Sequence, residues 1–367
     1  MTVLFYISLF IVGFGVLRFL IALLNFLTRP ILPFGKPVDS PKVSVLIPAR
    51  NEEINISKLL DMVVNQSYDN IEVIVYDDQS DDRTAAIVEE FKFTDDRVSL
   101  ISGDGLPTGW MGKNHACHRL AQSAKGHYLL FLDADVKVSP SFVENAVAYA
   151  QRKKLVLLSM FPRQELQTMG ERLVVPNMNW ILLSLLFLRL VRFSKRPSLA
   201  AANGQMMMFD AKVYHENLWH QLVKSSPVED IALSRLIKRK RLPMTTLLGT
   251  NDVSCRMYGS YKEAINGFSK NVTAFFGGSI IVTLLFAIVG IIGPFLVFVS
   301  LPSPLILLYL FCLFSARMLI ARLSEQSVVA NILLWPLQHV AFLHLVYSAL
   351  VFKRCKSAEW KGRKILN

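Results

Sequence analysis

Two aspartates directly follow a short apolar segment near the middle of the chain. The segment runs from Tyr128 to Leu132 after Gly126, and its aromatic and apolar residues predict a buried strand. Asp133 and Asp135 come next, and residues two apart in an extended chain point to the same side. Such a pair at the carboxyl end of a strand could hold Mg²⁺ or Mn²⁺ together with substrate phosphates. An exposed loop with two aspartates is the alternative, because Asp-x-Asp is common.

Polar residues also follow two other predicted strands, and an acidic pair opens a later helix. The strands are 43–47 and 71–76; the polar residues after them are Arg50, Glu52, Asp77 and Asp78, and Pro48 directly follows the first strand. Glu229 and Asp230 follow Pro227 at the predicted start of a helix. Acids in a first turn complement the helix dipole, so this pair has a purely structural interpretation as well.

The elements that would position these residues alternate between strand and helix. Apolar residues recur with helical spacing over 54–64, and helices are also expected over 115–124 and 142–150. Strands that alternate with helices predict an α/β domain with a mostly parallel sheet, which we place at residues 42–276. The carboxyl ends of parallel strands meet at one edge of a sheet, so the acidic residues are expected to lie together there.

Apolar stretches flank this domain. Residues 1–28 are long enough for an N-terminal membrane anchor, in which Arg18 must face protein or reach toward the surface. Residues 277–352 hold three further apolar stretches, of which the third is the most polar and contains Pro336. We expect the first two to cross the membrane and the third to be re-entrant or interfacial.

The charge distribution predicts the topology and the class of partner. The formal net charge is +12, and many basic residues lie beside apolar stretches, including a basic tail at 353–367. This placement favours an anionic membrane surface over nucleic acid. Positive charges follow the first apolar stretch, so the domain and the tail are expected in the cytoplasm of a cell-membrane protein. Residues 173–193, apolar but flanked by arginines, are interpreted as an interfacial helix in preference to a buried core helix.

Three segments at the strand ends resemble the family 2 glycosyltransferases of the GT-A fold. They read VLIPARNEE at 45–53, VYDDQS at 75–80 and LDAD at 132–135. WMGKNHAC at 110–117, RMY at 256–258 and EWKGR at 359–363 are similar to membrane-bound members that glycosylate carotenoid acids and to relatives in hopanoid pathways. The resemblance covers nearly the whole chain. It implies transfer of a hexose from a UDP-sugar, with UDP-glucose as the default donor, to a lipid or terpenoid acceptor.

The resemblance also implies roles for individual residues. Pro48, Arg50 and Glu52 would border the nucleotide base, and Asp78 would accept a hydrogen bond from the uracil imide. Asp133 would bind the ribose and Asp135 the metal that bridges the diphosphate. In the catalytic Glu229-Asp230 pair, Asp230 would be the base. The common Asp-Gly-Ser is here Asp78-Gln79-Ser80, and glutamine adopts positive φ less easily than glycine, so a changed loop that still binds the nucleotide is expected.

Lys113 and Arg256 are cations close to these segments, and we expect one or both to contact the diphosphate. The alternatives are a surface position for Lys113 and a structural ion pair for Arg256. Two other functions remain open from the sequence: transfer of a sugar to a polyprenyl phosphate, and a catalytically inactive membrane scaffold. A scaffold needs none of the four aspartates Asp78, Asp133, Asp135 and Asp230.

Overall fold

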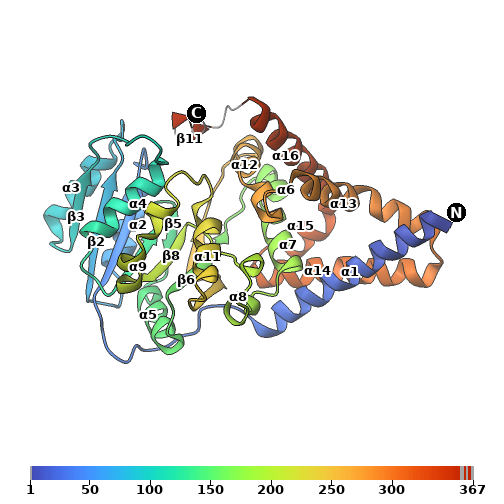
Figure 1. Ribbon diagram of the computed structural model, residues 1–367, viewed down its shortest axis with the longest axis horizontal. Helices are drawn as coiled ribbons and strands as arrows, with labels where there is room; N and C mark the ends of the chain where they lie inside the picture. The colour runs from blue at the N-terminus through green and yellow to red at the C-terminus, as the bar shows by residue number, and fades with distance from the viewer. Residues whose placement is uncertain (1, 356–358, 361–362, 365–367) are drawn as a thin grey trace.

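The structure is a computed structural model that describes residues 2–355, 359–360 and 363–364. A sheet domain lies at one end and long helices project from it, with the N-terminus at the far tip (Figure 1). In the basic tail at 353–367, residues 356–358, 361–362 and 365–367 lie outside the described residues. The predicted segment 359–363 is therefore described only in part. Two short strands, β11 (Glu359–Trp360) and β12 (Arg363–Lys364), pair antiparallel there.

A seven-stranded mixed sheet forms the centre of the domain, in the order β3-β2-β1-β4-β8-β6-β9. The strands are β1 (Val43–Ala49), β2 (Ile71–Asp77), β3 (Val98–Ser102), β4 (Tyr128–Leu132), β6 (Leu157–Phe161), β8 (Met206–Asp210) and β9 (Met244–Leu248). Only β8 runs antiparallel to its neighbours in this sheet. The predicted mostly parallel sheet is therefore confirmed. A smaller sheet pairs β5 (Val136–Val138), β10 (Val253–Cys255) and β7 (Arg163–Gln164).

Helices cover both faces of the large sheet, which explains why its central strands are almost continuously apolar. One face packs against α2 (Ile56–Val64), α3 (Thr84–Thr94) and α5 (Phe142–Lys153). The other packs against α4 (Gly112–Ser123), α9 (Ala211–Asn217), α10 (Trp219–Leu222) and α11 (Glu229–Arg239). Because β2, β1 and β4 are parallel neighbours, the candidate residues that follow them lie at one edge of the sheet.

The segment 173–193 is not the single helix that we predicted. It forms α6 (Met169–Val174), α7 (Pro176–Leu185) and α8 (Arg189–Phe193), and η1 (Pro197–Leu199) follows. Pro176 begins a new helix because proline fits the first helical position but cannot continue a helix already formed. Most of α7 is buried beneath α1 and α14, so its apolar residues face protein. Its position relative to a membrane surface remains a prediction.

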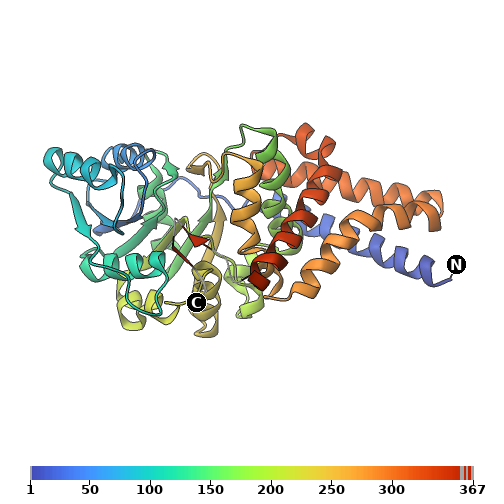
Figure 2. The same cartoon turned by 90° about the horizontal axis from the view of Figure 1, so that it is seen from above.

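Four of the described helices are long and apolar enough to cross a membrane. They are α1 (Thr2–Thr28), α13 (Ile280–Ser300), α14 (Ser303–Leu323) and α16 (Trp335–Cys355). In both views α1, α13 and α14 project together, whereas α16 runs across the base of this bundle, against α12 (Tyr261–Ser269), α6 and η2 (Val272–Phe276) (Figures 1 and 2). The third apolar stretch breaks into α15 (Val328–Leu333) and α16 immediately before Pro336. The number of crossings remains a prediction.

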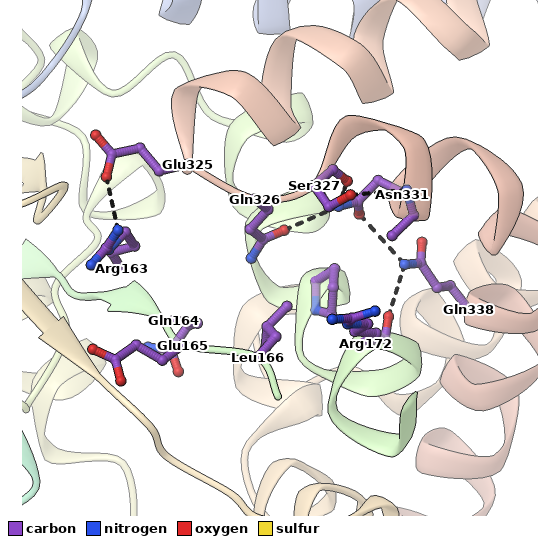
Figure 3. A pocket seen from close by; sticks show the side chains of 12 residues that line it. Arg163, Gln164, Glu165, Leu166, Arg172, Glu325, Gln326, Ser327, Asn331 and Gln338 are labelled. Atoms are coloured by element: carbon purple, nitrogen blue, oxygen red, sulfur yellow. Dashed lines mark hydrogen bonds and ion pairs between the residues drawn. The ribbon is translucent and has the colours of Figure 1, made fainter. Parts of the chain in front are cut away.

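Polar contacts attach the bundle to the sheet domain. Arg163 of β7 forms an ion pair of 3.5 Å with Glu325, and Gln338 donates to the carbonyl of Arg172 at 3.0 Å, around a pocket of about 200 Å³ (Figure 3). Asn25 of α1 donates to the carbonyls of Leu183 and Leu186, so it joins α1 to the end of α7. These contacts make the bundle and the domain one packed unit.

Candidate active site

A cavity of about 510 Å³ lies at the carboxyl edge of the sheet. Its polar end is lined by Lys113 from α4, Asp133 after β4, Gly204 and Gln205 before β8, and Glu229 and Asp230 from the first turn of α11. The structure therefore brings together predicted residues that are up to about a hundred positions apart in the sequence. It does so because each follows or precedes a strand of the same sheet, as the α/β pattern required.

Lys113 is at the centre of the polar network. Its Nζ lies 2.7 Å from Asp133 Oδ2 and 3.2 Å from Glu229 Oε1, and it donates to the carbonyl of Gly204 at 3.2 Å. Burial would lower the pKa of Lys113, but the two carboxylates outweigh burial and hold it well above its usual value. Lys113 is thus a charged residue inside the cavity. The alternative of a surface position does not apply.

Asp133 and Asp135 lie in a turn between β4 and β5, and the extended geometry assumed from their spacing is wrong. The amide of Val136 donates to the carbonyl of Asp133 at 3.1 Å, which closes the turn. Gln205 Nε2 lies 3.3 Å from Asp135 Oδ2 and directs this carboxylate toward the loop before β8. Burial, with the neighbouring charges of Asp133 and Glu52, raises the pKa of Asp135 to about 7. The positive charge of Lys113 thus balances only part of the negative charge of Asp133, Asp135 and Glu52.

Asp230 points back from α11 toward the loop before β8. Its Oδ2 accepts from the backbone amide of Gly204 at 3.0 Å, and its Oδ1 accepts from the amide of Ile231 at 2.7 Å. Burial and the adjacent Glu229 raise the pKa of Asp230 to about 7. A carboxyl group that titrates near neutral pH and faces a cavity has the properties of a general base.

The residues expected around the nucleotide base lie together at the ends of β1 and β2. Arg50 Nη1 donates to the carbonyls of Asp78 and Gln79, and the amide of Asp78 donates to the carbonyl of Ala49 at 2.8 Å. Asp78 is 2% exposed. Gln79 has a φ of +57°, so the position that is commonly glycine does require the left-handed conformation, and glutamine adopts it here. Pro48 is the residue before the last of β1, and Glu52 accepts from Asn55 Nδ2 at 2.9 Å.

Arg256 forms an ion pair with a buried residue outside the polar end of the cavity. Its Nη2 and Nε donate to Glu171 Oε1 at 2.7 and 3.2 Å, and Glu171 is fully buried. Glu171 also completes the capping box of α6 with Thr168. The structural ion pair, which was the alternative for Arg256, is therefore present. Contact of Arg256 with a diphosphate stays a prediction.

Comparison with known proteins agrees with this geometry. A family model described as Glycosyl transferase family 2 matches residues 44–218. Residues 44–218 form a glycosyltransferase family 2 domain.

The 4,4'-diaponeurosporenoate glycosyltransferase of Staphylococcus haemolyticus is 32% identical over 251 residues, which cover 66% of this chain and 65% of the relative. The enzyme of the same name from Staphylococcus aureus (strain USA300) is 27% identical over 241 residues, or 65% of this chain and 62% of the relative. The matches thus span just under two thirds of each relative.

The fold of the family 2 domain is also found among solved structures. A mannosyltransferase from Pyrobaculum calidifontis, in complex with GDP-Man and Mn²⁺, superposes with a TM-score of 0.57 at 17% identity. The superposition covers 94% of this chain and 98% of that one. The predicted GT-A fold is confirmed by this likeness.

Two residues that shape the candidate active site, Gly204 and Gln205, were given no role from the sequence. Gly204 packs so closely that a Cβ there would lie 2.7 Å from Glu229 Oε1 and 3.2 Å from Lys113 Nζ. Gln205 contacts Asp135, and its backbone carbonyl accepts from the amide of Asp133 at 3.0 Å. The available signal was the polar Asn-Gly-Gln sequence directly before the apolar strand β8, where loops of this sheet carry function.

The cavity has a second, apolar end that faces the projecting helices. Met178 of α7, Phe268 of α12, Phe275 of η2, Ile280 of α13 and Ala349 of α16 line it. The same cavity therefore reaches from Asp133, Glu229 and Asp230 to two of the four described helices that are apolar enough to cross a membrane.

Proposed function

We propose that this protein is a membrane-bound inverting glycosyltransferase that moves a hexose from a UDP-sugar to a lipid acceptor. The acceptor class that we favour is a carotenoid acid or related terpenoid. The observation that carries the proposal is the single cavity in which Asp133, Glu229 and Asp230 occupy one end and apolar side chains of η2, α13 and α16 the other. A sugar nucleotide suits the first end and an apolar chain the second. The relatives named for a carotenoid acid support the acceptor class.

Different residues would bind the sugar nucleotide and act on the acceptor. Pro48, Arg50, Glu52 and Asp78 would border the base and Asp133 the ribose, while Lys113 would balance the diphosphate charge. Asp230 would take the proton of an acceptor hydroxyl, with Glu229 holding Lys113 in place. If the acceptor is a carboxylic acid, it is already ionised near neutral pH because carboxyl groups titrate near ~4. Asp230 would then orient the acceptor and would not need to deprotonate it.

The residues at the turn after β4 fit a divalent cation, Mg²⁺ or Mn²⁺. Burial is the main cause of the raised pKa of Asp135, and the negative charges of Asp133 and Glu52, which Lys113 balances only in part, raise it further. Among the described residues no three His, Cys, Asp or Glu side chains form a metal cluster, so diphosphate oxygens and water would complete the ligand set. When bound, the cation would stabilise the negative charge that develops on the leaving diphosphate.

The membrane arrangement forms part of the proposal. Ser300, at the end of α13, donates to Ser8 Oγ at 2.7 Å, so the turn between α13 and α14 lies beside the N-terminal part of α1. We place this end outside the cell and the family 2 domain in the cytoplasm, as the positive charges after α1 favour. With α16 across the base of the bundle, three crossings would leave the basic tail on the cytoplasmic side.

The test is sugar transfer by the purified full-length protein, with radiolabelled UDP-glucose, Mn²⁺ and a carotenoid acid in lipid vesicles. We expect a labelled glycolipid from the wild type and from Asp96→Asn, whose side chain is exposed and does not line the cavity. Asp135→Ala, Asp230→Asn and a chelator should each abolish or strongly reduce transfer. Full activity of both Asp135→Ala and Asp230→Asn would contradict the assigned roles. Transfer to a polyprenyl phosphate but not to the carotenoid acid would select the rival acceptor, and no transfer to any acceptor would favour the inactive scaffold.

A further inference from the structure

Two arginines lie inside the helical bundle around one tryptophan. The guanidinium carbons of Arg18 in α1 and Arg317 in α14 lie 4.0 and 4.5 Å from the ring centre of Trp180 in α7. Arg317 is 3% exposed. The aromatic face attracts both cations but carries no net charge, so two positive charges remain close together in an apolar surrounding.

Within the part of the chain that the structure describes, no ion pair joins either arginine to a carboxylate. The sequences of α1, α7, α13, α14 and α16 contain neither Asp nor Glu. Arg18 Nε and Nη2 donate to Ser184 Oγ at 3.0 and 2.8 Å, and Arg317 Nη1 donates to Gln338 Oε1 at 2.7 Å. Among the residues that the structure describes, these acceptors are neutral groups. Uncompensated buried charges are costly, so the site favours an anion from outside the chain.

A cavity next to Arg18 has room for such a group. It has a volume of about 40 Å³ and is lined by Arg18, Trp180, Tyr309 and His339 together with apolar side chains of α1 and α13. One water needs ~10–15 Å³, so the space suits a group as large as a carboxylate or phosphate. Gly290 is part of the wall, and a Cβ there would lie 2.3 Å from the His339 ring, so the close approach of α16 to α13 depends on this glycine.

The surroundings indicate that the anion carries an apolar tail. Leu17, Ile288 and Ile292, which neighbour the cavity residues along α1 and α13, are 52%, 39% and 47% exposed. A free ion would have to leave water and pass these side chains, whereas the headgroup of a lipid arrives with its chain already in the apolar layer. We propose that Arg18, backed by Arg317, binds the anionic headgroup of a membrane lipid in the cavity beside Trp180. This site is separate from the cavity that holds the carboxylates.

The test is native mass spectrometry of the full-length protein released from nanodiscs that contain equal amounts of phosphatidylglycerol and phosphatidylcholine. No sugar donor is present, so the result is independent of the proposed glycosyl transfer. We expect the wild type to retain one phosphatidylglycerol with at least tenfold preference. Arg18→Gln should lose the preference, Arg18→Lys should keep part of it, and Arg322→Gln, an exposed arginine on the same helix as Arg317, should behave as wild type.

Thermal unfolding of the detergent-solubilised protein gives a second readout. Phosphatidylglycerol and oleate, each an anion with an apolar tail, should raise the melting temperature of the wild type and not of Arg18→Gln. Equal effects of phosphatidylcholine, or equal lipid retention by Arg18→Gln and wild type, would overturn the proposal. An equal rise with inorganic phosphate alone would overturn the assignment to a lipid. If Arg18→Gln fails to fold, Arg18→Lys decides the question, because a preference for phosphatidylglycerol equal to that of the wild type would overturn the proposal.

Discussion

Lys113 Nζ lies 2.7 Å from Asp133 Oδ2, and this ion pair connects the first turn of α4 to the turn that follows β4. The same ammonium group lies 3.2 Å from Glu229 at the start of α11. One cation therefore ties together three segments of the candidate active site and offsets part of its negative charge. Several properties of the site depend on this single residue.

Lys113→Gln should lower kcat/KM for sugar transfer by roughly 10²-fold, the range found when one electrostatic contact to developing charge is removed. Loss of the cation should also shift the titration of the remaining carboxyl groups to higher pH, because Lys113 lowers the pKa of Asp133, Asp135 and Asp230. The measurement is kcat/KM against pH. Lys92→Gln, which removes an exposed lysine that pairs with Glu89, is the control. An unchanged pH profile in Lys113→Gln would contradict this role.

Activity toward a hydroxyl acceptor should rise as the pH increases through about 7. Asp230 must be ionised to accept a proton, and its pKa is raised to about 7 by burial and Glu229. Asp230→Asn should remove this dependence and lower kcat by roughly 10²–10⁴-fold. With a carboxylic acid acceptor, the same variant should mainly raise KM. A comparison of the two acceptor classes therefore reports the role of Asp230 directly.

The same titration predicts the sign of a stability effect. The folded-state pKa of Asp230 is about 7, above the ordinary 3.8, so the folded state binds the proton more tightly than the unfolded state. The stabilisation is complete below about pH 4 and is lost as the pH rises through about 7. Asp230→Asn, which stays neutral, should therefore gain melting temperature relative to wild type between pH 5 and pH 8. A constant difference across this range would speak against a raised pKa.

Gly204→Ala should impair catalysis with little effect on folding. The new methyl group would lie 2.7 Å from Glu229 Oε1 and 3.2 Å from Lys113 Nζ, so it would displace both from the network. Misplacing catalytic groups by about 1 Å can cost roughly 10²-fold in rate. Gly13→Ala in α1 is the control, because a Cβ at Gly13 meets nothing within 4 Å. Steady-state kinetics and thermal melting of both variants separate the two effects.

Phe275→Asp should weaken binding of the lipid acceptor and leave the donor side intact. Phe275 lines the apolar end of the cavity, where an unpaired carboxylate would be costly against an apolar chain. We expect KM for the acceptor to rise roughly tenfold or more, whereas slow hydrolysis of the sugar nucleotide stays unchanged. Phe93→Asp, at a position 92% exposed on α3, should leave both activities unchanged. An equal loss of hydrolysis in Phe275→Asp would place this residue outside the acceptor site.

Local patterns predicted the sheet and its polar edge well. Apolar runs such as 128–132, bounded by glycine and aspartate, read as buried strands because burial on both faces leaves no place for polar residues. Arg18 faces protein, as the cost of a charge in an apolar helix required. The segment 173–193 is divided among α6, α7 and α8 and is not the predicted single helix, because Pro176 begins a new helix.

The sequence by itself determined the α/β architecture, the positions of the apolar helices and the set of carboxylates at the strand ends. These features depend on neighbouring residues, whose spacing a single chain displays. Only the tertiary structure decided that Lys113 joins Asp133 to Glu229, that Arg256 pairs with Glu171 and that one cavity reaches from Asp230 to α16. Such contacts join residues distant in the sequence, and their energies depend on distances and burial that exist only once the chain has packed.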